Sequence, residues 1–423
     1  MASTAIVGAQ WGDEGKAKII DRLASSAQVV VRTAGGNNAG HTVTVQDQIY
    51  RFRLIPSGIL YPDVTCILGN GTAIDPQDLL MEMRKLEERG VSLANLRISL
   101  RAHLVMPYHK ILDSLMEAAR GHEDLGTPRK GIGPCYMDKV ERIGLRVCDL
   151  LHPDEFAHKV KENVKIKNRY ITKVYGGIET VDPDEAVDAY LKYGEALRAY
   201  MADASLMVYT AIQEGQDVIF EGAQATLLDV GMGTYPYVTT SHPAAGGVCI
   251  GAGVGPAMVH HTLGVMKAYV TRVGKGPFPT ELFGGEAQEL RDRGGEYESD
   301  TGMARRVGWF DAVIGRLAVR VNGLESIALN KLDVCANMPV VKLCTGYNKN
   351  GSAVGDFPAS LEDLAECEPV YEEFEGWGKV DFCKTYEDLP EAAKRFICRV
   401  EELCQVPVTM IGVGPGREQT IMR

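Results

Sequence analysis

The chain has 423 residues, is 45% hydrophobic and carries a formal net charge of −11. A chain of this length buries a large core, as one α/β unit or as two domains. The acidic balance argues against a nucleic-acid-binding surface and against a polybasic membrane contact. We interpret the one basic run, Lys161 to Lys173, as a solvated helix face.

The ten cysteines, from Cys66 to Cys404, form no C-x-x-C pair, so neither a zinc site nor a disulfide framework is predicted. Free thiols in an acidic chain favour a reducing cytoplasm. We expect no signal peptide, because the first ten residues lack a charged region followed by an apolar one. The least polar long stretch, 244–266, contains many glycines, a proline and two histidines, so we interpret it as a buried loop and helix and not as a membrane span.

The first predicted element is a strand that runs into a glycine-rich turn, 8–16, with a helix starting over 17–21. The backbone N–H groups of such a turn, together with the helix dipole, favour a phosphate. The turn departs from the Walker pattern G-x-x-x-x-G-K-[ST], because Gln10 takes the first glycine position and Ala17 takes that of the metal-binding hydroxyl. A nucleotide bound here would meet a different set of side chains, with Asp13 at the tip as the key candidate.

The later elements alternate between short apolar strands and amphipathic helices. Strands are predicted at 29–31, 65–68, 217–220, 326–329 and 408–411, and helices begin near 76, 153, 183 (ending near Met201) and 390. The helix near 76 has Asp75 as its N-cap. Strands that end in glycine-rich turns, with helices between them, predict a large, mostly parallel sheet with its site at one edge. No repeat or linker divides the chain, so we expect one domain, 1–423, with a helical subdomain over about 100–205.

The segment Asn330-Lys331-Leu332-Asp333 directly follows a predicted buried strand. It resembles the N/T-K-x-D signature of GTP-binding proteins. A single carboxylate can accept both N1–H and the exocyclic amine of guanine, a donor pair that adenine lacks, while the stem of Lys331 can lie over the base. The alternative is that Asp333 is an ordinary loop or cap residue, but in a chain with a phosphate-binding turn the motif favours GTP.

Asp13 and His41 are the candidate acid–base couple, since each lies in a glycine-rich loop. Asp13 could bind Mg²⁺ or remove a proton, and His41 could donate a proton or stabilise a phosphate oxygen. The alternatives are an N-cap aspartate and a loop histidine with ordinary hydrogen-bond partners.

Ten longer motifs, in order from end to end, resemble those of adenylosuccinate synthetases: GAQWGDEGKAKIID, GGNNAGHT, LIPSGIL, GIGP, DKVERIGLR, FEGAQATLLD, GTYPYVT, TRVGKGPFPTEL, TGMARRVGWFD and NKLDV. The resemblance implies a homodimer in which each chain has one large, mostly parallel α/β sheet with flanking helical subdomains, related to the P-loop NTPases. It implies a ligase that forms a C–N bond, making adenylosuccinate from IMP, L-aspartate and GTP with Mg²⁺, for purine nucleotide biosynthesis.

The same resemblance implies a role for individual residues. Asp13 would take the N1 proton of IMP, His41 would stabilise the transferred phosphate, and Mg²⁺ would bind near Asp13 and the Gly40 carbonyl. The GTP contacts would be Gly12, Gly15, Lys16, Gly40, His41, Thr42, Lys331, Asp333 and Gly414. The contacts to IMP and aspartate would be Asn38, Thr127, Gln224, Thr239, Thr301, Arg305 and, reaching from the other subunit, Arg142.

Two loops depart from the pattern of that family. Pro128 replaces a threonine that would hold the IMP phosphate, and Met303 replaces an arginine that would contact both the ribose and the amino acid. With Ala304 and Asp300, the second loop has lost about three units of positive charge. Two hypotheses therefore stand beside the ordinary ligase: a paralogue that uses another nucleotide (such as a deoxynucleotide) or another amine, and a GTP-binding regulator without ligase activity. Ala17 disfavours the regulator, because a Walker-type switch needs Ser or Thr there.

Overall fold

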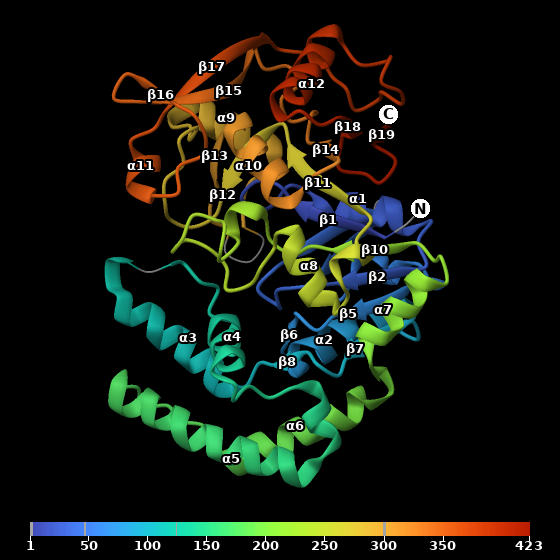
Figure 1. Ribbon diagram of the computed structural model, residues 1–423, viewed down its shortest axis with the longest axis vertical. Helices are drawn as coiled ribbons and strands as arrows, with labels where there is room; N and C mark the ends of the chain where they lie inside the picture. Colours follow the sequence, from blue (N-terminus) through green and yellow to red (C-terminus); the bar gives the residue numbers. More distant parts are fainter. Residues whose placement is uncertain (1–2, 46–47, 124, 299–301) are drawn as a thin grey trace.

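The computed structural model describes all residues except 1–2, 46–47, 124 and 299–301 (Figure 1). A ten-stranded sheet in the order β19-β18-β14-β11-β1-β10-β2-β5-β7-β9 runs through it. Every neighbouring pair is parallel except β18 and β19. The predicted fold class, a large and mostly parallel α/β sheet, is confirmed. In chain order the strands are β1 (Thr4–Gly8), β2 (Val29–Arg32), β5 (Thr65–Leu68), β7 (Leu96–Ser99), β9 (Met201–Ala202), β10 (Val218–Glu221), β11 (His261–Lys267), β14 (Ser326–Asn330), β18 (Val408–Gly412) and β19 (Thr420–Met422).

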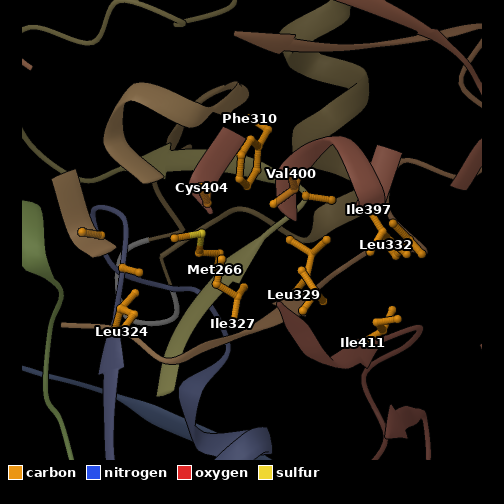
Figure 2. Packing of buried hydrophobic residues seen from close by; sticks show 14 of the residues in the cluster. Met266, Phe310, Leu324, Ile327, Leu329, Leu332, Ile397, Val400, Cys404 and Ile411 are labelled. Atoms are coloured by element: carbon orange, nitrogen blue, oxygen red, sulfur yellow. The ribbon is translucent and has the colours of Figure 1, made fainter. Parts of the chain in front are cut away.

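Both faces of this sheet are buried, as its nearly continuous apolar strands require. Successive side chains of a strand point to opposite faces, so Ile6 packs in one hydrophobic cluster and Val7 in the other. Helices α1 (Lys16–Ala24) and α2 (Pro76–Glu87) cover the face of Ile6. The opposite face is covered by α7 (Ala204–Gln213), α8 (Ala245–Ala252), α10 (Ala312–Asn322) and α12 (Glu391–Cys404). Figure 2 shows Leu329 of β14 packed below Val400 of α12.

The start of α2 is confirmed in detail. The Asp75 carboxylate accepts hydrogen bonds from the N–H groups of Gln77, at 3.1 Å, and Asp78, at 3.3 Å. Pro76 takes the first helical position, where its missing N–H costs nothing.

Four helices form a lobe beyond the sheet edge, in the lower part of Figure 1. They are α3 (Pro107–Arg120), α4 (Ile132–Glu141), α5 (Pro153–Arg169) and α6 (Pro183–Leu197). The last of these was predicted to end near Met201; its α-helical part ends at Leu197, and a 3₁₀ turn continues to Tyr200. The helix gives way to a 3₁₀ turn, Arg198–Tyr200, because Met201 pairs with Ile98 at the edge of the central sheet.

The sequence suggested that the basic run 161–173 is a solvated helix face. The structure confirms this for only part of the run. Lys167 is buried and forms an ion pair with Asp138 of α4. Lys161 does lie at the surface, paired with Asp184 at 2.7 Å. Spacing along a helix does not reveal that a neighbouring helix presents a buried carboxylate to one lysine of the run.

The stretch 244–266 was only partly predicted. Its helix exists as α8, but the expected loop is replaced from His261 by β11, which lies between β1 and β14 in the central sheet. Gly264 within the strand sits where an added Cβ would lie 2.4 Å from Leu324, and this glycine helped to hide the strand pattern. In the part of the chain that the structure describes, no helix is long and apolar enough to cross a membrane.

The remaining elements lie outside the central sheet. A second sheet packs around α10 and α12, at the top of Figure 1, and contains β12 (Tyr269–Arg272), β13 (Arg306–Asp311), β15 (Val340–Lys349), β16 (Ser352–Val354) and β17 (Glu368–Glu375). The pairs β3 (His41–Val45) with β4 (Gln48–Phe52) and β6 (Ala73–Ile74) with β8 (His103–Leu104) are separate, as are the helices α9 (Gly284–Gly294) and α11 (Leu361–Ala365). The short helical turns are Ser57–Leu60, Gly121–Glu123, Val147–Leu151, Tyr170–Val174, Thr226–Leu228 and Pro256–Met258.

Candidate active site

The turn between β1 and α1 is tightly wound. Gly12, Asp13 and Gly15 all have left-handed backbone conformations, with φ of 99°, 58° and 82°. Glycine adopts such angles readily, but an aspartate there is uncommon and is held by its surroundings. The strained position puts the Asp13 carboxylate at the tip of the turn, where its side chain is 35% exposed.

Gln10 explains why the turn departs from the Walker pattern. Its buried side chain donates to the carbonyls of Lys267, at 3.1 Å, and Tyr269, at 3.2 Å, and accepts the N–H of Lys267 at 3.1 Å. The residue that replaces the Walker glycine therefore fastens the turn to the junction of β11 and β12. A glycine at this position would leave all three backbone groups without that partner.

The donors of the turn predicted to bind a phosphate are taken by the carboxylate of Glu14. This fully buried side chain accepts the N–H groups of Gln10, at 3.1 Å, and Gly12, at 2.9 Å, and lies 2.7 Å from Lys16 Nζ. Two backbone donors and one ammonium are the kind of partners that a phosphate uses. The turn therefore has the geometry to bind an anion.

The segment 330–333 lies directly against the turn. The Asn330 side chain donates to the carbonyls of Glu14, at 2.8 Å, and Gly15, at 3.2 Å. Asp333 Oδ1 is buried with no hydrogen-bond partner among the described residues, and burial raises the pKa of this carboxyl. A buried acceptor without a donor is what a base-reading carboxylate presents before its ligand binds.

Lys18 ties the first helix to the C-terminal loop. Its ammonium donates to the carbonyls of Gly414, at 2.6 Å, and Gln419, at 2.7 Å. Burial lowers the pKa of Lys18 to about 8, although nearby Asp333 opposes the shift. The predicted GTP contacts Gly12, Gly15, Lys16, Asp333 and Gly414 thus converge from three distant segments.

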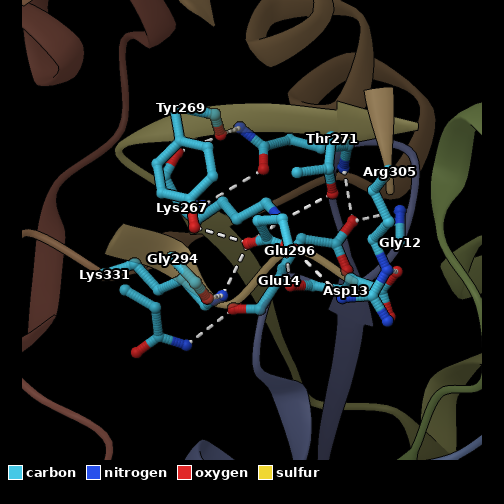
Figure 3. A network of polar contacts seen from close by, with 12 residues as sticks. Gly12, Asp13, Glu14, Lys267, Tyr269, Thr271, Gly294, Glu296, Arg305 and Lys331 are labelled. Carbon is cyan, nitrogen blue, oxygen red and sulfur yellow. Dashed lines mark hydrogen bonds and ion pairs between the residues drawn. The ribbon is translucent and has the colours of Figure 1, made fainter. Parts of the chain in front are cut away.

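Asp13 belongs to a network of charged side chains centred on Glu296 (Figure 3). Arg305 Nε lies 3.1 Å from Asp13 Oδ2, and Arg305 donates from Nη1 to Glu296 Oε2 at 3.0 Å. Lys331 donates to Glu296 Oε1 at 2.6 Å, so its ammonium is held within the protein. Lys267 Nζ lies 3.2 Å from the same oxygen and donates to the Asp13 carbonyl at 3.2 Å.

His41 has a separate pair of charged neighbours. Its Nδ1 lies 2.8 Å from Glu221 Oε1 and its Nε2 lies 3.2 Å from Arg32 Nη1. Burial, reinforced by the Arg32 guanidinium, lowers the pKa of His41, so the imidazole is neutral near pH 7. Burial alone would raise the pKa of Glu221, but His41 and Arg32 hold it below its usual range.

The predicted IMP residues within the described chain lie on three loops, one of which contains Thr127, and at a helix end. Gln224, with φ of 58°, reaches within 3.5 Å of Asn38 Oδ1, and its own Oε1 is buried without a partner among the described residues. Thr239 lies half-buried in the loop after β10, and Arg142 is exposed at the end of α4 with φ of 69°. Thr301 lies outside the described residues, as does Asp300.

The loop that contains Thr127 is anchored on α3. The Thr127 hydroxyl donates to Asp113 at 3.0 Å, and Glu117 Oε2 accepts the N–H groups of Leu125, Gly126 and Thr127 at 3.0–3.3 Å. The two carboxylates occupy the donors that a phosphate would use. A phosphate bound by Thr127 has to displace Asp113.

Several residues of the site were not predicted. Arg32, Glu221 and Lys267 each end an apolar strand, and a charge in that position is the signal that could have found them. Glu296 follows two glycines in an ordinary polar segment, and no sequence signal marks it. Among the described residues, no group of three or more His, Cys, Asp or Glu side chains is placed to hold a metal ion by itself.

Comparison with known proteins decides the family. Residues 5–421 match the family model of adenylosuccinate synthetase. The chain is 54% identical over 423 residues to an adenylosuccinate synthetase of Thermoanaerobacter sp., covering all of this chain and 99% of that one. The chain belongs to the adenylosuccinate synthetase family. The relative from Acetivibrio thermocellus is 52% identical over the full length of both chains.

The solved structures agree. A fully ligated adenylosuccinate synthetase from Plasmodium falciparum is 37% identical, with a TM-score of 0.93 over 99% of both chains. A cyanophage S-2L succinoaminodeoxyadenylate synthetase bound to dGMP and dATP covers 100% of this chain and 95% of its own, but at 22% identity and a TM-score of 0.61 it shares the fold alone. Membership of the adenylosuccinate synthetase family confirms the predicted GTP-dependent C–N ligase, which joins IMP and aspartate.

Proposed function

We propose that Asp13 is the general base of this ligase. It takes the N1 proton of IMP, the O6 oxygen attacks the γ-phosphate of GTP, and GDP leaves. The amine of aspartate then displaces phosphate from C6, giving adenylosuccinate. The observation that carries the proposal is the Asp13 carboxylate, half-exposed at the tip of the phosphate turn with Arg305 3.1 Å away. A base in this place meets both the purine and the phosphate.

His41 is proposed to stabilise the phosphate during its transfer. Its ring is held between Glu221 and Arg32, so it cannot rotate freely without losing one of them. A neutral imidazole with Nδ1 facing a carboxylate favours the tautomer that keeps its proton on that nitrogen. Arg32, buried beside it, adds positive charge near the developing negative charge of the phosphoryl group.

Guanine is proposed to bind between α1 and the C-terminal loop. Asp333 Oδ1, buried and without a partner among the described residues, would accept N1–H and the exocyclic amine. Gly414 lies against the end of the Gln419 side chain, which an added Cβ would approach to 2.4 Å and push aside. Gly12, Gly15, Lys16, Gly40 and Thr42 complete the proposed phosphate contacts.

The residues present fit a magnesium ion. Mg²⁺ favours oxygen ligands and is usually held by one or two protein groups together with substrate phosphates. The Asp13 carboxylate and the carbonyl of the exposed Gly40 are such groups, and Arg305 lies against Asp13 Oδ2, which leaves Oδ1 for the ion. When bound, the ion supplies charge neutralisation between the phosphates.

We propose that two copies of the chain form a dimer in which Arg142 reaches the IMP phosphate of the other copy. Arg142 is exposed and has no ion pair with any described carboxylate. On the same helix, Met137 and Val140 are 53% and 79% exposed and are one turn apart. An apolar stripe beside an unpaired cation suits contact with a second copy. Asn38, Gln224, Thr239 and Thr127 would complete the IMP contacts, with Thr301 and Arg305 toward aspartate.

A cytoplasmic location is part of the same proposal. All ten cysteines are free thiols, seven of them buried, which suits a reducing compartment.

The direct test is GTP consumption by the purified protein against a matrix of acceptors. IMP, dIMP, GMP and dGMP are each combined with aspartate or another amino acid, and the C–N product is identified by mass. We expect turnover only with IMP and aspartate. A preference for dIMP, which the exposed Met303 would then explain, or GTP hydrolysis without any acceptor, would contradict the proposal.

A further inference from the structure

Glu296 is a fully buried carboxylate with four donors around it (Figure 3). Oε1 accepts from Lys331 Nζ at 2.6 Å and from the Tyr269 hydroxyl at 2.5 Å, and it lies 3.2 Å from Lys267 Nζ. Oε2 accepts from Arg305 Nη1 at 3.0 Å. A charge removed from water in this way persists only because its surroundings compensate it, so these partners are not interchangeable with solvent.

The partners of Glu296 lead to two different parts of the site. Lys331 belongs to the segment 330–333, called the guanine segment because guanine is proposed to bind there. Its ammonium is also held by the Gly294 carbonyl at 3.1 Å. Arg305 holds the Asp13 carboxylate, while Lys267 donates to the Asp13 main-chain carbonyl. The proposed base is thus fixed at its carboxylate and at its backbone, by two cations that share one buried anion.

We propose that Glu296 is a positioning residue that links recognition of the guanine ring to the placement of Asp13. This inference rests on the proposed function, since it takes Lys331 as a guanine contact and Asp13 as the base. A guanine ring over the stem of Lys331 fixes that ammonium, and the ammonium fixes Glu296. Glu296 in turn sets Arg305 and Lys267, so nucleotide binding restricts the motion of the base.

The charges explain why the carboxylate is needed and not merely a polar group. Lys267, Lys331 and Arg305 bring three positive charges, which Glu296 and Asp13 share. Without the Glu296 charge, the carboxylates left to act on these cations are Asp13 and Glu14 at Lys267, and Asp13 and Glu298 at Arg305. Arg305 and Lys267 then lose the shared anion that fixes their positions, so Asp13 is held less firmly at its carboxylate and at its backbone.

The test compares Glu296→Gln, which keeps the shape and removes the charge, with Glu289→Gln. Glu289 is on α9, seven residues earlier in the chain, and pairs at the surface with Arg293, which makes it a matched control. We expect Glu296→Gln to lower kcat by about tenfold or more and to raise the KM for GTP by about fivefold, while Glu289→Gln changes neither. The melting temperature separates these effects from loss of folded protein.

Linkage is tested with Lys331→Met in both backgrounds. In the wild-type background, we expect Lys331→Met to raise the KM for GTP and also to lower kcat, because Glu296 loses one of its cations. In the Glu296→Gln background, the same change should raise the KM alone, since the connection to Asp13 is already broken. Equal losses of kcat in the two backgrounds would overturn the linkage.

Three further outcomes are decisive. Wild-type kcat and KM for GTP in Glu296→Gln would overturn the proposal. If Glu296→Gln does not fold, Tyr269→Phe removes one neutral donor from the same oxygen, and we expect about threefold changes in both parameters; no change would overturn the proposal. A wild-type protein that makes no adenylosuccinate would refute the proposed function itself, and this result is distinct from an active wild type with a normal Glu296→Gln variant.

Discussion

Replacing Asp333 by asparagine should change which nucleoside triphosphate the protein binds. In the structure, Asp333 Oδ1 is buried with no partner among the described residues, and the Asn330 side chain holds the preceding strand end against the phosphate turn. Guanine would give this carboxylate two donors, N1–H and the exocyclic amine. In Asp333→Asn, an NH₂ group replaces one oxygen, so one of these contacts becomes a meeting of two donors.

The size of the effect follows from those two contacts. A hydrogen bond to a charged group contributes about 1.5–3 kcal/mol, so losing one of the two costs about 1.5–3 kcal/mol. We therefore expect kcat/KM for GTP to fall by about 10- to 100-fold. Folding should not suffer, because burial already disfavours the charge on Asp333 and raises its pKa. Asparagine removes that cost.

Initial rates with GTP and with xanthosine triphosphate provide the assay. Xanthine carries a carbonyl where guanine has its amine, so the NH₂ group of Asp333→Asn gains an acceptor and activity should return with that nucleotide. Asp381→Asn is the control, since Asp381 is exposed and close enough to influence Asp333 electrostatically. An unchanged KM for GTP in Asp333→Asn, with no gain toward xanthosine triphosphate, would refute the assignment of the guanine site.

Three further predictions concern the base, the subunit contact and a buried carboxyl. Asp13→Asn should lower phosphoryl transfer by about 10²–10⁴-fold with GTP binding largely intact, and retained turnover would exclude Asp13 as the base. Arg142→Leu should raise the KM for IMP by about tenfold or more, and mixing it with Asp13→Asn should restore about a quarter of wild-type activity through mixed dimers; no recovery would contradict a shared site. Asp311, the N-cap of α10, has its pKa raised to about 6 by burial. The folded state therefore binds this proton more tightly, so the contribution of Asp311 to stability falls by about 3 kcal/mol as the pH rises from about 4 to 6. Asp311→Asn should remove that pH dependence, which is checked by the melting temperatures of wild type and variant at pH 4.5 and 7.5. An equal change in melting temperature between the two pH values in both proteins would contradict the prediction.

The parts of the fold that follow from local pattern were predictable. The turn after β1, the N-cap Asp75 and the strands β5 and β14 each depend on residues within a few positions of one another. The short helix α8 was also foreseen. The strand β11 was not, because Gly264 and the histidines before it break the apolar pattern, and only its position between β1 and β14 makes it a strand.

The site residues also divide into those that the local sequence predicts and those that it does not. Asp13 and Asp333 are recognisable, because each lies in a motif whose chemistry can be read locally. The sequence shows Gln10 only as a departure from the Walker pattern. The structural role of Gln10 is its hydrogen bond to the backbone of Lys267, 257 residues away. Glu296 has no local pattern at all, since its partners come from β11, β12, the guanine segment and the loop before β13. Contacts between segments so far apart in the chain are set by the sheet order, which no single stretch of sequence contains.

In the proposed mechanism, GTP activates the purine oxygen before the amine arrives. This order of steps can be followed with IMP labelled with ¹⁸O at position 6, incubated with GTP and aspartate. If O6 attacks the γ-phosphate, the label leaves with that group, and we expect inorganic phosphate that contains one ¹⁸O atom per adenylosuccinate formed. Phosphate released without ¹⁸O, alongside adenylosuccinate, would contradict the mechanism.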